Sequence, residues 1–392
     1  MNVLYILYAI VFFFSMLMGV LVLPRIVSIS KEKNLMDAPD QRKVHSSPTP
    51  RLGGISFLPI TLMSVFLFNV LCVLVLHEEV SKSDTQAFLK MQALGIGSML
   101  LYLVGIADDL VGVNFKAKFA AQIVAGLLFP ICGLSFHNIL GQFGLYNMPA
   151  IVDYAITVFM VVYITNAINL IDGVDGLASG ICILAFTLYA VMFLFLNHPF
   201  MASTCLSILG VLIVFFVFNV FGGEHHSLKK LFMGDTGSLT LGYFISFLIL
   251  SLTSYQNTRA LVYTGVLYMV FSPLVIPLLD IIRVVWARYR DRVPLFLPDK
   301  RHIHHKLLRT GLSARATMVT LLVMTLYFIG LNILLPQYMR SRWVVIGNVL
   351  SWIAMHLIIN FFIKRKAKED KSLEERYANK KNTINDKKSF DL

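Results

Sequence analysis

The sequence predicts an all-α integral membrane protein that crosses the bilayer many times. Hydrophobic residues make up 57% of the 392 residues and charged residues only 14%. The mean hydropathy is +0.73, whereas soluble domains carry roughly 25% charged residues. The apolar residues gather in runs of about 20, the length of a helix that spans the hydrocarbon core. This pattern excludes a soluble globular protein, and we expect no nucleic-acid partner.

About eleven apolar runs are long enough to be transmembrane helices. They lie at 3–24, 53–76, 87–107, 119–135, 150–167, 177–196, 201–221, 236–253, 260–282, 315–336 and 343–363. The first run is too long for a signal-peptide core and no basic region precedes it, so we expect it to be a retained helix. We treat residues 1–363 as one transmembrane domain and residues 364–392 as a basic, disordered cytoplasmic tail on the lipid surface.

The distribution of Lys and Arg predicts the orientation of these helices. Loops that follow the odd-numbered runs, together with the tail, hold 29 of the 34 Lys and Arg residues. Cytoplasmic loops of membrane proteins carry the excess of positive charge. We therefore predict an outer N-terminus and a cytoplasmic C-terminus. Much of the formal charge of +12 then faces the cytoplasm, where it can meet anionic lipid or an anionic substrate.

Five polar motifs fall on this predicted cytoplasmic side. In chain order they are RKVHSSPTPRLGG (42–54), GIADDL (105–110), NAINLIDGVDGL (166–177), FMGDTGSLTLG (232–242) and PDKRHIHHKLL (298–308). They lie at the predicted cytoplasmic ends of the first, third, fifth, eighth and ninth of the eleven runs. An acid close to the hydrocarbon is costly, so it indicates a functional site by default. The motifs therefore predict one active site at the cytoplasmic face.

The acids of these motifs predict phosphoryl chemistry with a hard metal ion. They are Asp108, Asp109, Asp172, Asp175 and Asp235. Carboxylates on short Gly-containing turns, with no Cys among them, suit Mg²⁺, which combines one or two carboxylates with phosphate oxygens. Basic residues on the same side would face an anionic substrate. They are Arg42, Lys43, His45, Lys116, Lys118, Arg301, His302, His304 and His305.

Each signal taken alone also has a simpler interpretation. Asp108 and Asp109 fit a solvated helix end, and Lys118 fits ordinary cytoplasmic positive charge. Asn219 fits an interhelical hydrogen bond. A transporter or a non-catalytic lipid-binding scaffold is the distant alternative. Acids of a transporter would line a path through the bilayer, whereas these acids gather on one face.

Taken together and in this order, the motifs resemble those of the polyprenyl-phosphate N-acetylhexosamine-1-phosphate transferases, the glycosyltransferase 4 family. The resemblance extends from Leu35-Met36-Asp37 through the five motifs and AKFAAQ (117–122). The chain is similar above all to the branch that loads N-acetylglucosamine 1-phosphate onto undecaprenyl phosphate.

This resemblance implies a reaction, a cofactor and a location. The donor would be UDP-N-acetylglucosamine and the acceptor undecaprenyl phosphate in the membrane lipid. UMP would be released, and the lipid-diphosphate sugar would initiate a cell-surface polysaccharide. The family's reaction needs Mg²⁺, for which Mn²⁺ is the alternative. The resemblance also implies the bacterial cytoplasmic (inner) membrane and allows a homodimer.

The resemblance also implies roles for single residues. The implied metal ligands are Asp235, Asp109 and Asp172. The implied catalytic residues are Asp108, Asp109, Asp172 and Lys118, with Asp108 either a general base or a positioning group. The implied donor-binding residues are Asn169, Gly173, Val174, Asp175, Asn219 and Phe232, with Asp175 on the uracil base and Phe232 stacked against it. The implied further substrate-binding residues are Arg301, His302, His304, His305, Lys43 and His45, of which the 301–305 cluster would contact diphosphate and sugar.

A different donor is the live alternative within the enzyme class. Relatives in this family take a muramoyl-pentapeptide sugar or 6-deoxy aminosugars. The stretches at 302–305 and 42–50 look like the N-acetylglucosamine branch rather than the pentapeptide branch. A single hydroxyl is weakly discriminated by a pocket that does not hydrogen-bond it. The 6-deoxy donors therefore stay open at this point.

Overall fold

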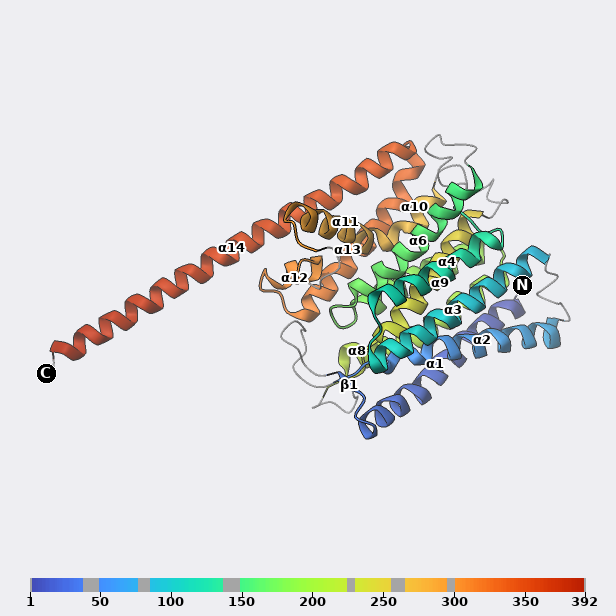
Figure 1. The fold of residues 1–392 in the computed structure, drawn as a ribbon, viewed down its shortest axis with the longest axis horizontal. Coiled ribbons are helices and arrows are strands. Elements are labelled where there is room, and N and C mark those ends of the chain that lie inside the picture. Colours follow the sequence, from blue (N-terminus) through green and yellow to red (C-terminus); the bar gives the residue numbers. More distant parts are fainter. Residues whose placement is uncertain are drawn as a thin grey trace.

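The computed structural model describes residues 2–37, 49–76, 85–136, 149–223, 230–254, 265–294 and 300–390. Within these ranges the chain forms a helical bundle with one small antiparallel strand pair (Figure 1). Ten described helices or helical runs are long and apolar enough to cross a membrane. The chain is therefore a multi-pass helical membrane protein, and its orientation in the bilayer stays a prediction.

Helices account for nearly all elements of the described chain. The first half of the described chain contains α1 (Asn2–Glu32), β1 (Met36–Asp37), β2 (Thr49–Pro50), η1 (Leu52–Ser56), α2 (Phe57–Leu71), η2 (Cys72–Leu76), α3 (Thr85–Val111), α4 (Phe115–Ile131) and α6 (Ala150–Ile171). The second half contains α7 (Leu177–Phe195), α8 (Pro199–Phe221), α9 (Gly234–Ser254), α10 (Val266–Phe271), η3 (Ser272–Leu274), α11 (Val275–Arg290), α12 (Ile303–Leu308), α13 (Ala314–Tyr338) and α14 (Ser341–Phe390).

Helix α4 begins and ends four residues before the predicted run 119–135. The Asn114 side chain caps its start by accepting a hydrogen bond from the Lys116 backbone N–H at 3.0 Å. Its end is fixed by Gly133, whose φ of +74° reverses the chain and lets Leu134 N donate to Phe129 O. With 17 residues, α4 is shorter than the ten membrane-length runs. The eleventh crossing therefore stays a prediction.

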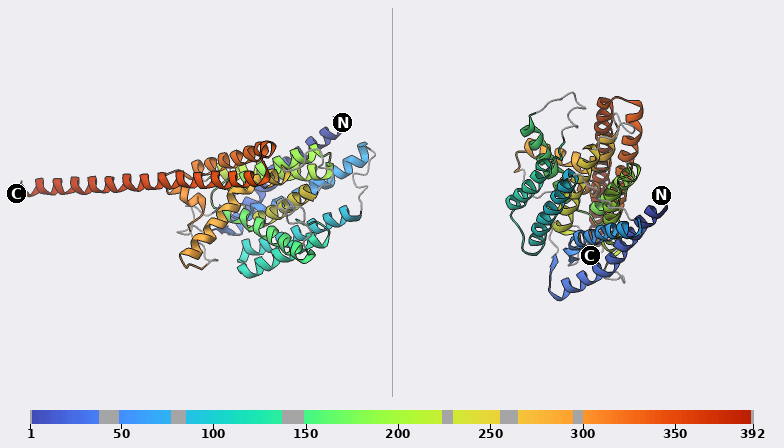
Figure 2. Two further views of the ribbon diagram at one scale, coloured as in Figure 1. Left: turned by 90° about the horizontal axis from the view of Figure 1, so that it is seen from above. Right: turned by 90° about the vertical axis from the view of Figure 1, so that its right-hand side faces the viewer.

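Helix α14 continues past residue 364, where we predicted a separate disordered tail. The structure extends it without a break to Phe390, and it projects far from the bundle (Figures 1 and 2). Ion pairs with i,i+4 spacing stabilise this exposed part, since Arg365 meets Glu369 and Lys366 meets Asp370, each at 3.1 Å. Charged residues with good helix propensity therefore extend the helix beyond the apolar run 343–363.

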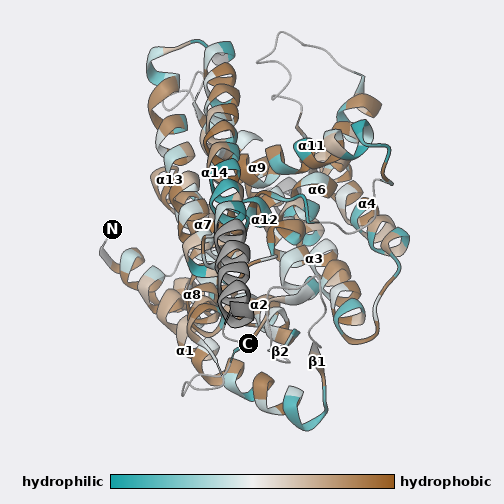
Figure 3. Ribbon diagram, turned by 90° about the vertical axis from the view of Figure 1, so that its left-hand side faces the viewer, coloured by the Kyte–Doolittle hydropathy of each residue, from teal (hydrophilic) through white to brown (hydrophobic). Residues whose placement is uncertain are grey.

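The outer surface of the bundle is apolar, as expected of a surface that faces lipid. Large hydrophobic side chains are more than half exposed on several outer helices, among them Phe13, Phe66, Phe159 and Leu350. Brown, the colour of hydrophobic residues, predominates on helices such as α1, α8 and α13 in Figure 3. A soluble protein rarely exposes such a large continuous apolar surface.

Helix α9 is the most buried helix and lies at the centre of the bundle. It packs extensively on α3 and α6, and it also contacts η1. Small residues permit this approach, because a Cβ added to Gly242 would lie 2.6 Å from Thr165 Cα, and one added to Gly105 would lie 2.4 Å from Thr236 Cα. The N-terminus of α9 is thereby held against the C-terminal end of α3.

Pro50 and the first turn of η1 pair with the segment before α9. Gly53 N donates to Phe232 O at 3.0 Å and Gly54 N donates to Met233 O at 2.8 Å, while Phe232 N donates to Pro50 O. The motif of residues 42–54 thus reaches the motif of residues 232–242, although Lys43 and His45 lie outside the described residues. These contacts gather the predicted motifs at one end of the bundle.

Candidate active site

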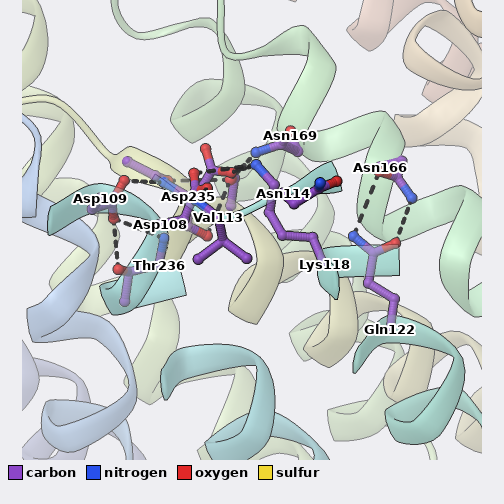
Figure 4. Close-up of polar contacts among 12 residues, drawn as sticks. Asp108, Asp109, Val113, Asn114, Lys118, Gln122, Asn166, Asn169, Asp235 and Thr236 are labelled. Atoms are coloured by element: carbon purple, nitrogen blue, oxygen red, sulfur yellow. Dashed lines mark hydrogen bonds and ion pairs between the residues drawn. The ribbon is translucent and has the colours of Figure 1, made fainter. Parts of the chain in front are cut away.

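Three acids form the core of the candidate site. Asp108 and Asp109 lie at the end of α3, and Asp235 lies in the first turn of α9. One carboxylate oxygen from each lies within 4.8 Å of those of the others, as Figure 4 illustrates. Among the described residues this is the group of acids, His and Cys whose spacing suits a metal ion.

Asp109 caps the N-terminus of α9. Its carboxylate accepts hydrogen bonds from Asp235 N at 2.8 Å, Thr236 N at 3.0 Å and Thr236 Oγ1 at 2.6 Å. These backbone N–H groups have no acceptor within the helix, and a negative charge here also favours the helix dipole. Gly234 makes room for the contact, because an added Cβ would lie 2.5 Å from Asp109 Oδ2. Asp109 therefore positions Asp235.

Lys118 joins the other two acids. Its Nζ lies 2.8 Å from Asp235 Oδ2 and 3.2 Å from Asp108 Oδ2. The second oxygen of Asp108 accepts a hydrogen bond from Val113 N at 2.7 Å, within the turn that joins α3 to α4. The short α3–α4 turn thus brings a cation from the start of α4 between two carboxylates. The carboxylates of Asp108 and Asp235 thus bind a positively charged group between them.

The loop between α6 and α7 lies beside this cluster. Asp172 ends α6, and burial, followed by the carboxylates of Asp235 and Asp175, raises its pKa to about 7. Asp172 lies outside the group of three acids that the described residues place together. Asp175 pairs with Lys230 Nζ at 2.5 Å, and the same Nζ lies 5.4 Å from the centre of the Phe232 ring.

Asn219 holds this loop in place. Its side-chain oxygen accepts a hydrogen bond from Gly176 N at 2.5 Å, and its side-chain nitrogen donates to Leu231 O at 2.9 Å. Asn219 is 3% exposed, and Gly176 has a φ of +78° that favours glycine. The geometry therefore gives Asn219 a positioning role, whereas its predicted contact with the nucleotide stays a prediction.

The His residues of the 301–305 motif lie at or within α12, next to the α6–α7 loop. The ring of His304 is buried and lies so close to Gly173 that an added Cβ would sit 2.3 Å from His304 Nε2. The His302 ring stacks parallel to His304 with centroids 5.8 Å apart, and the His305 centroid is 4.3 Å away. Burial, then His305 and His302, lowers the pKa of His304 to about 3, so its imidazole is neutral.

The remaining predicted residues are found around this core. Asn169 donates from its amide to Ser238 Oγ at 2.9 Å, and Val174 is buried in the α6–α7 loop. Arg301 pairs with Asp291 at 2.7 Å. The structure therefore gathers the predicted residues of four motifs at one end of the bundle. Their individual roles toward substrate and metal stay predictions.

Three charged residues that the sequence analysis did not single out contribute to this region. Lys230 pairs with Asp175, while Arg283 and Asp280 lie next to the start of α12. A signal for Asp280 exists in the sequence, because it is the single acid in the apolar run 260–282. Lys230 gave no comparable signal, since it lies in the polar stretch between the apolar runs 201–221 and 236–253.

Comparison with known proteins identifies the family. The family model described as "Glycosyl transferase family 4" matches residues 91–253, which extend from α3 to α9. A relative from Bacillus subtilis, named "Probable undecaprenyl-phosphate N-acetylglucosaminyl 1-phosphate transferase", is 30% identical over 90% of this chain and 88% of its own. The chain belongs to glycosyl transferase family 4. The resemblance noted in the sequence is thereby confirmed.

Other members of glycosyl transferase family 4 match over most of their length. A relative from Escherichia coli strain K12, named "Undecaprenyl-phosphate alpha-N-acetylglucosaminyl 1-phosphate transferase", is 26% identical over 86% of each chain. A relative from Mycobacterium leprae, named "Decaprenyl-phosphate N-acetylglucosaminephosphotransferase", is 28% identical over 72% of each chain. This family 4 member is therefore a membrane-embedded transferase.

Proposed function

We propose that this chain transfers N-acetylglucosamine 1-phosphate from UDP-N-acetylglucosamine to undecaprenyl phosphate and releases UMP. The main support for this proposal is that an acid cluster and a basic motif lie close together at one end of a membrane bundle. Asp108 and Asp235 face Lys118, and His304 lies against the α6–α7 loop. The names of the Bacillus subtilis and Escherichia coli relatives support this donor and acceptor.

We also propose Mg²⁺ as the cofactor, with Mn²⁺ as the alternative. The donor set fits a hard ion, because it offers carboxylate oxygens within 4.8 Å of one another and no sulfur. The ammonium of Lys118 already pairs with two of these acids, so a metal ion would compete with it for the same oxygens. Asp108, Asp109 and Asp235 would hold the ion. When bound, it would offset the repulsion between two phosphorylated substrates.

The reaction joins two anions, so positive charge from the chain is needed. An oxygen of the lipid phosphate forms a bond to the phosphorus that bears the sugar. The bond from that phosphorus to the oxygen kept by UMP breaks. Lys118 and Arg301 would bind phosphate oxygens. His304, with its neutral ring, would offer one hydrogen bond rather than a charge.

In this proposal Asp108 helps to hold the metal ion and does not act as a general base. Its two oxygens already accept from Val113 N and pair with Lys118. A phosphate monoester has a second pKa near 6, so the acceptor is largely ionised at neutral pH without a base. This account favours charge placement over proton removal.

We propose the bacterial inner membrane as the location, with the site facing the cytoplasm. The excess of Lys and Arg in the loops of that side supports this orientation. A water-soluble nucleotide sugar and a membrane-held acceptor would then meet at the interface. The product would be the lipid-diphosphate sugar that initiates a surface polysaccharide.

The donor assignment is tested with purified protein in lipid nanodiscs, undecaprenyl phosphate and Mg²⁺. UMP release is measured for UDP-N-acetylglucosamine, a 6-deoxy aminosugar donor and the muramoyl-pentapeptide donor. We expect the highest kcat/KM with UDP-N-acetylglucosamine. A higher value for another donor would overturn the donor assignment, and UMP release without the lipid acceptor would overturn the acceptor.

A further inference from the structure

Asp280 is a buried acid of α11 that pairs with Arg283 of the same helix and with the residues at the start of α12. Its side chain is 2% exposed, and it lies in the apolar helical run Val266–Arg290. Burying a carboxylate costs several kcal/mol unless it is paired and fully hydrogen-bonded. An acid at such a position therefore calls for a specific partner set, which the structure provides.

Both oxygens of Asp280 accept from the 301–305 motif or its neighbour. Oδ2 lies 2.8 Å from His302 Nδ1, and Ile303 N donates to both oxygens at 3.1 and 3.2 Å. Arg283 donates to Oδ1 through Nη2 at 2.7 Å and through Nε at 3.1 Å. The same guanidinium donates to the backbone oxygen of Arg301. The carboxylate thus contacts two consecutive residues of the motif, His302 and Ile303, and Arg283 links it to a third, Arg301.

These contacts determine how α12 begins. Ile303 is the first residue of this six-residue helix, and its N–H has no acceptor within the helix. Asp280 supplies that acceptor from another helix, whereas His302 makes no side-chain cap. A helix this short has little stability of its own. Its position therefore depends on the contact with α11.

The contact with His302 also reaches the acid loop. A carboxylate at Nδ1 holds the proton on that nitrogen and fixes the ring orientation. The fixed ring of His302 stacks parallel to His304 at 5.8 Å. His304 in turn lies against Gly173, next to Asp172. A chain of contacts therefore runs from Asp280 to the loop of the candidate active site.

We propose that Asp280 is a positioning residue that holds α12 so that His304 and His305 face the α6–α7 loop. This inference rests on the proposed function for its catalytic consequence, but its structural part is independent of the reaction. Asp280 itself contacts His302, Ile303 and Arg283, so it acts on the substrates only through the motif.

The first test compares Asp280→Asn with Asp153→Asn by hydrogen–deuterium exchange of the segment 300–309. Asp153 is a matched control because it is a buried carboxylate at the start of α6 that accepts from Ser135 Oγ at 2.6 Å. We expect faster exchange in α12 for Asp280→Asn and no change there for Asp153→Asn. Equal exchange in α12 for wild type and Asp280→Asn would overturn the proposal. If Asp280→Asn does not fold, His302→Gln must produce the faster exchange.

The second test is a double-mutant cycle of Asp280→Asn and His302→Gln. Its readout is kcat for transfer from UDP-N-acetylglucosamine. If Asp280 acts through His302, the double variant loses no more kcat than Asp280→Asn alone, which we expect to lose roughly 10²-fold. Fully additive losses would contradict the contact chain. A wild-type protein that transfers nothing from any donor would overturn the proposed function, while the exchange experiment would still decide the positioning role.

Discussion

Replacing Gly173 by Ala tests whether the contact between the α6–α7 loop and α12 is part of the active site. The added Cβ would lie 2.3 Å from His304 Nε2, whereas ordinary contact between such atoms needs about 3.5 Å. One of the two elements must therefore shift by about 1 Å. A misplacement of this size in an active site costs on the order of 10²-fold in rate. We expect Gly173→Ala to lower kcat/KM by about that factor.

The assay is UMP release by purified protein, normalised to the folded fraction. Gly95→Ala is the matched control, because the same methyl group there would meet nothing within 4 Å. We expect this control to stay within about twofold of wild type. Overpacking at Gly173 can also lower the free energy of unfolding by about 1–3 kcal/mol. The melting temperatures of both variants are therefore compared with that of wild type. Wild-type kcat/KM in folded Gly173→Ala would refute the reasoning.

The remaining predictions concern three polar residues of the site. Asn219→Leu leaves Gly176 N and Leu231 O without their buried partner. We therefore expect the free energy of unfolding to fall by about 2–4 kcal/mol, and an unchanged melting temperature would contradict this. Lys118→Met removes the ammonium that lies between two carboxylates, so Mn²⁺ binding without substrates, followed by electron paramagnetic resonance, should tighten roughly tenfold. Weaker Mn²⁺ binding would argue against that competition. Asp108→Asn should lower kcat by the same factor from pH 6.5 to 8.5, since the acceptor is already ionised above a pKa of about 6; recovery at high pH would restore the general-base hypothesis.

The helical class and most of the bundle could be predicted because apolar run length has a direct physical cause. A helix that crosses the hydrocarbon needs about 20 apolar residues, and α7 (Leu177–Phe195) begins at the predicted residue and ends one residue before the predicted end. The ends were less predictable where helix formation continues beyond the apolar run. α1 extends to Glu32 and α14 to Phe390, since polar residues with good helix propensity keep the backbone helical outside it.

The gathering of the motifs could also be predicted, but their pairwise contacts could not. Loop parity placed the acids on one side, and the structure brings Asp108 and Asp235 together across 127 positions of the chain. The partner of an individual side chain depends on which helices pack together, and a hydropathy pattern does not contain that information. Lys230 was missed for this reason, whereas Asp280 stood out in the sequence as a lone acid in an apolar run but its partners did not. Asn219 shows the same limit, because its two bonds depend on a turn with positive φ at Gly176.

The central claim is that a sugar phosphate, rather than a sugar, is transferred to a lipid phosphate. The most direct measurement is the identity of the nucleotide product, together with the mass of the lipid product, in a reaction of purified protein with UDP-N-acetylglucosamine, undecaprenyl phosphate and Mg²⁺. We predict one UMP per lipid product, and a lipid whose mass has grown by N-acetylglucosamine 1-phosphate. Release of UDP with gain of the sugar alone, or no lipid product at all, would contradict the account.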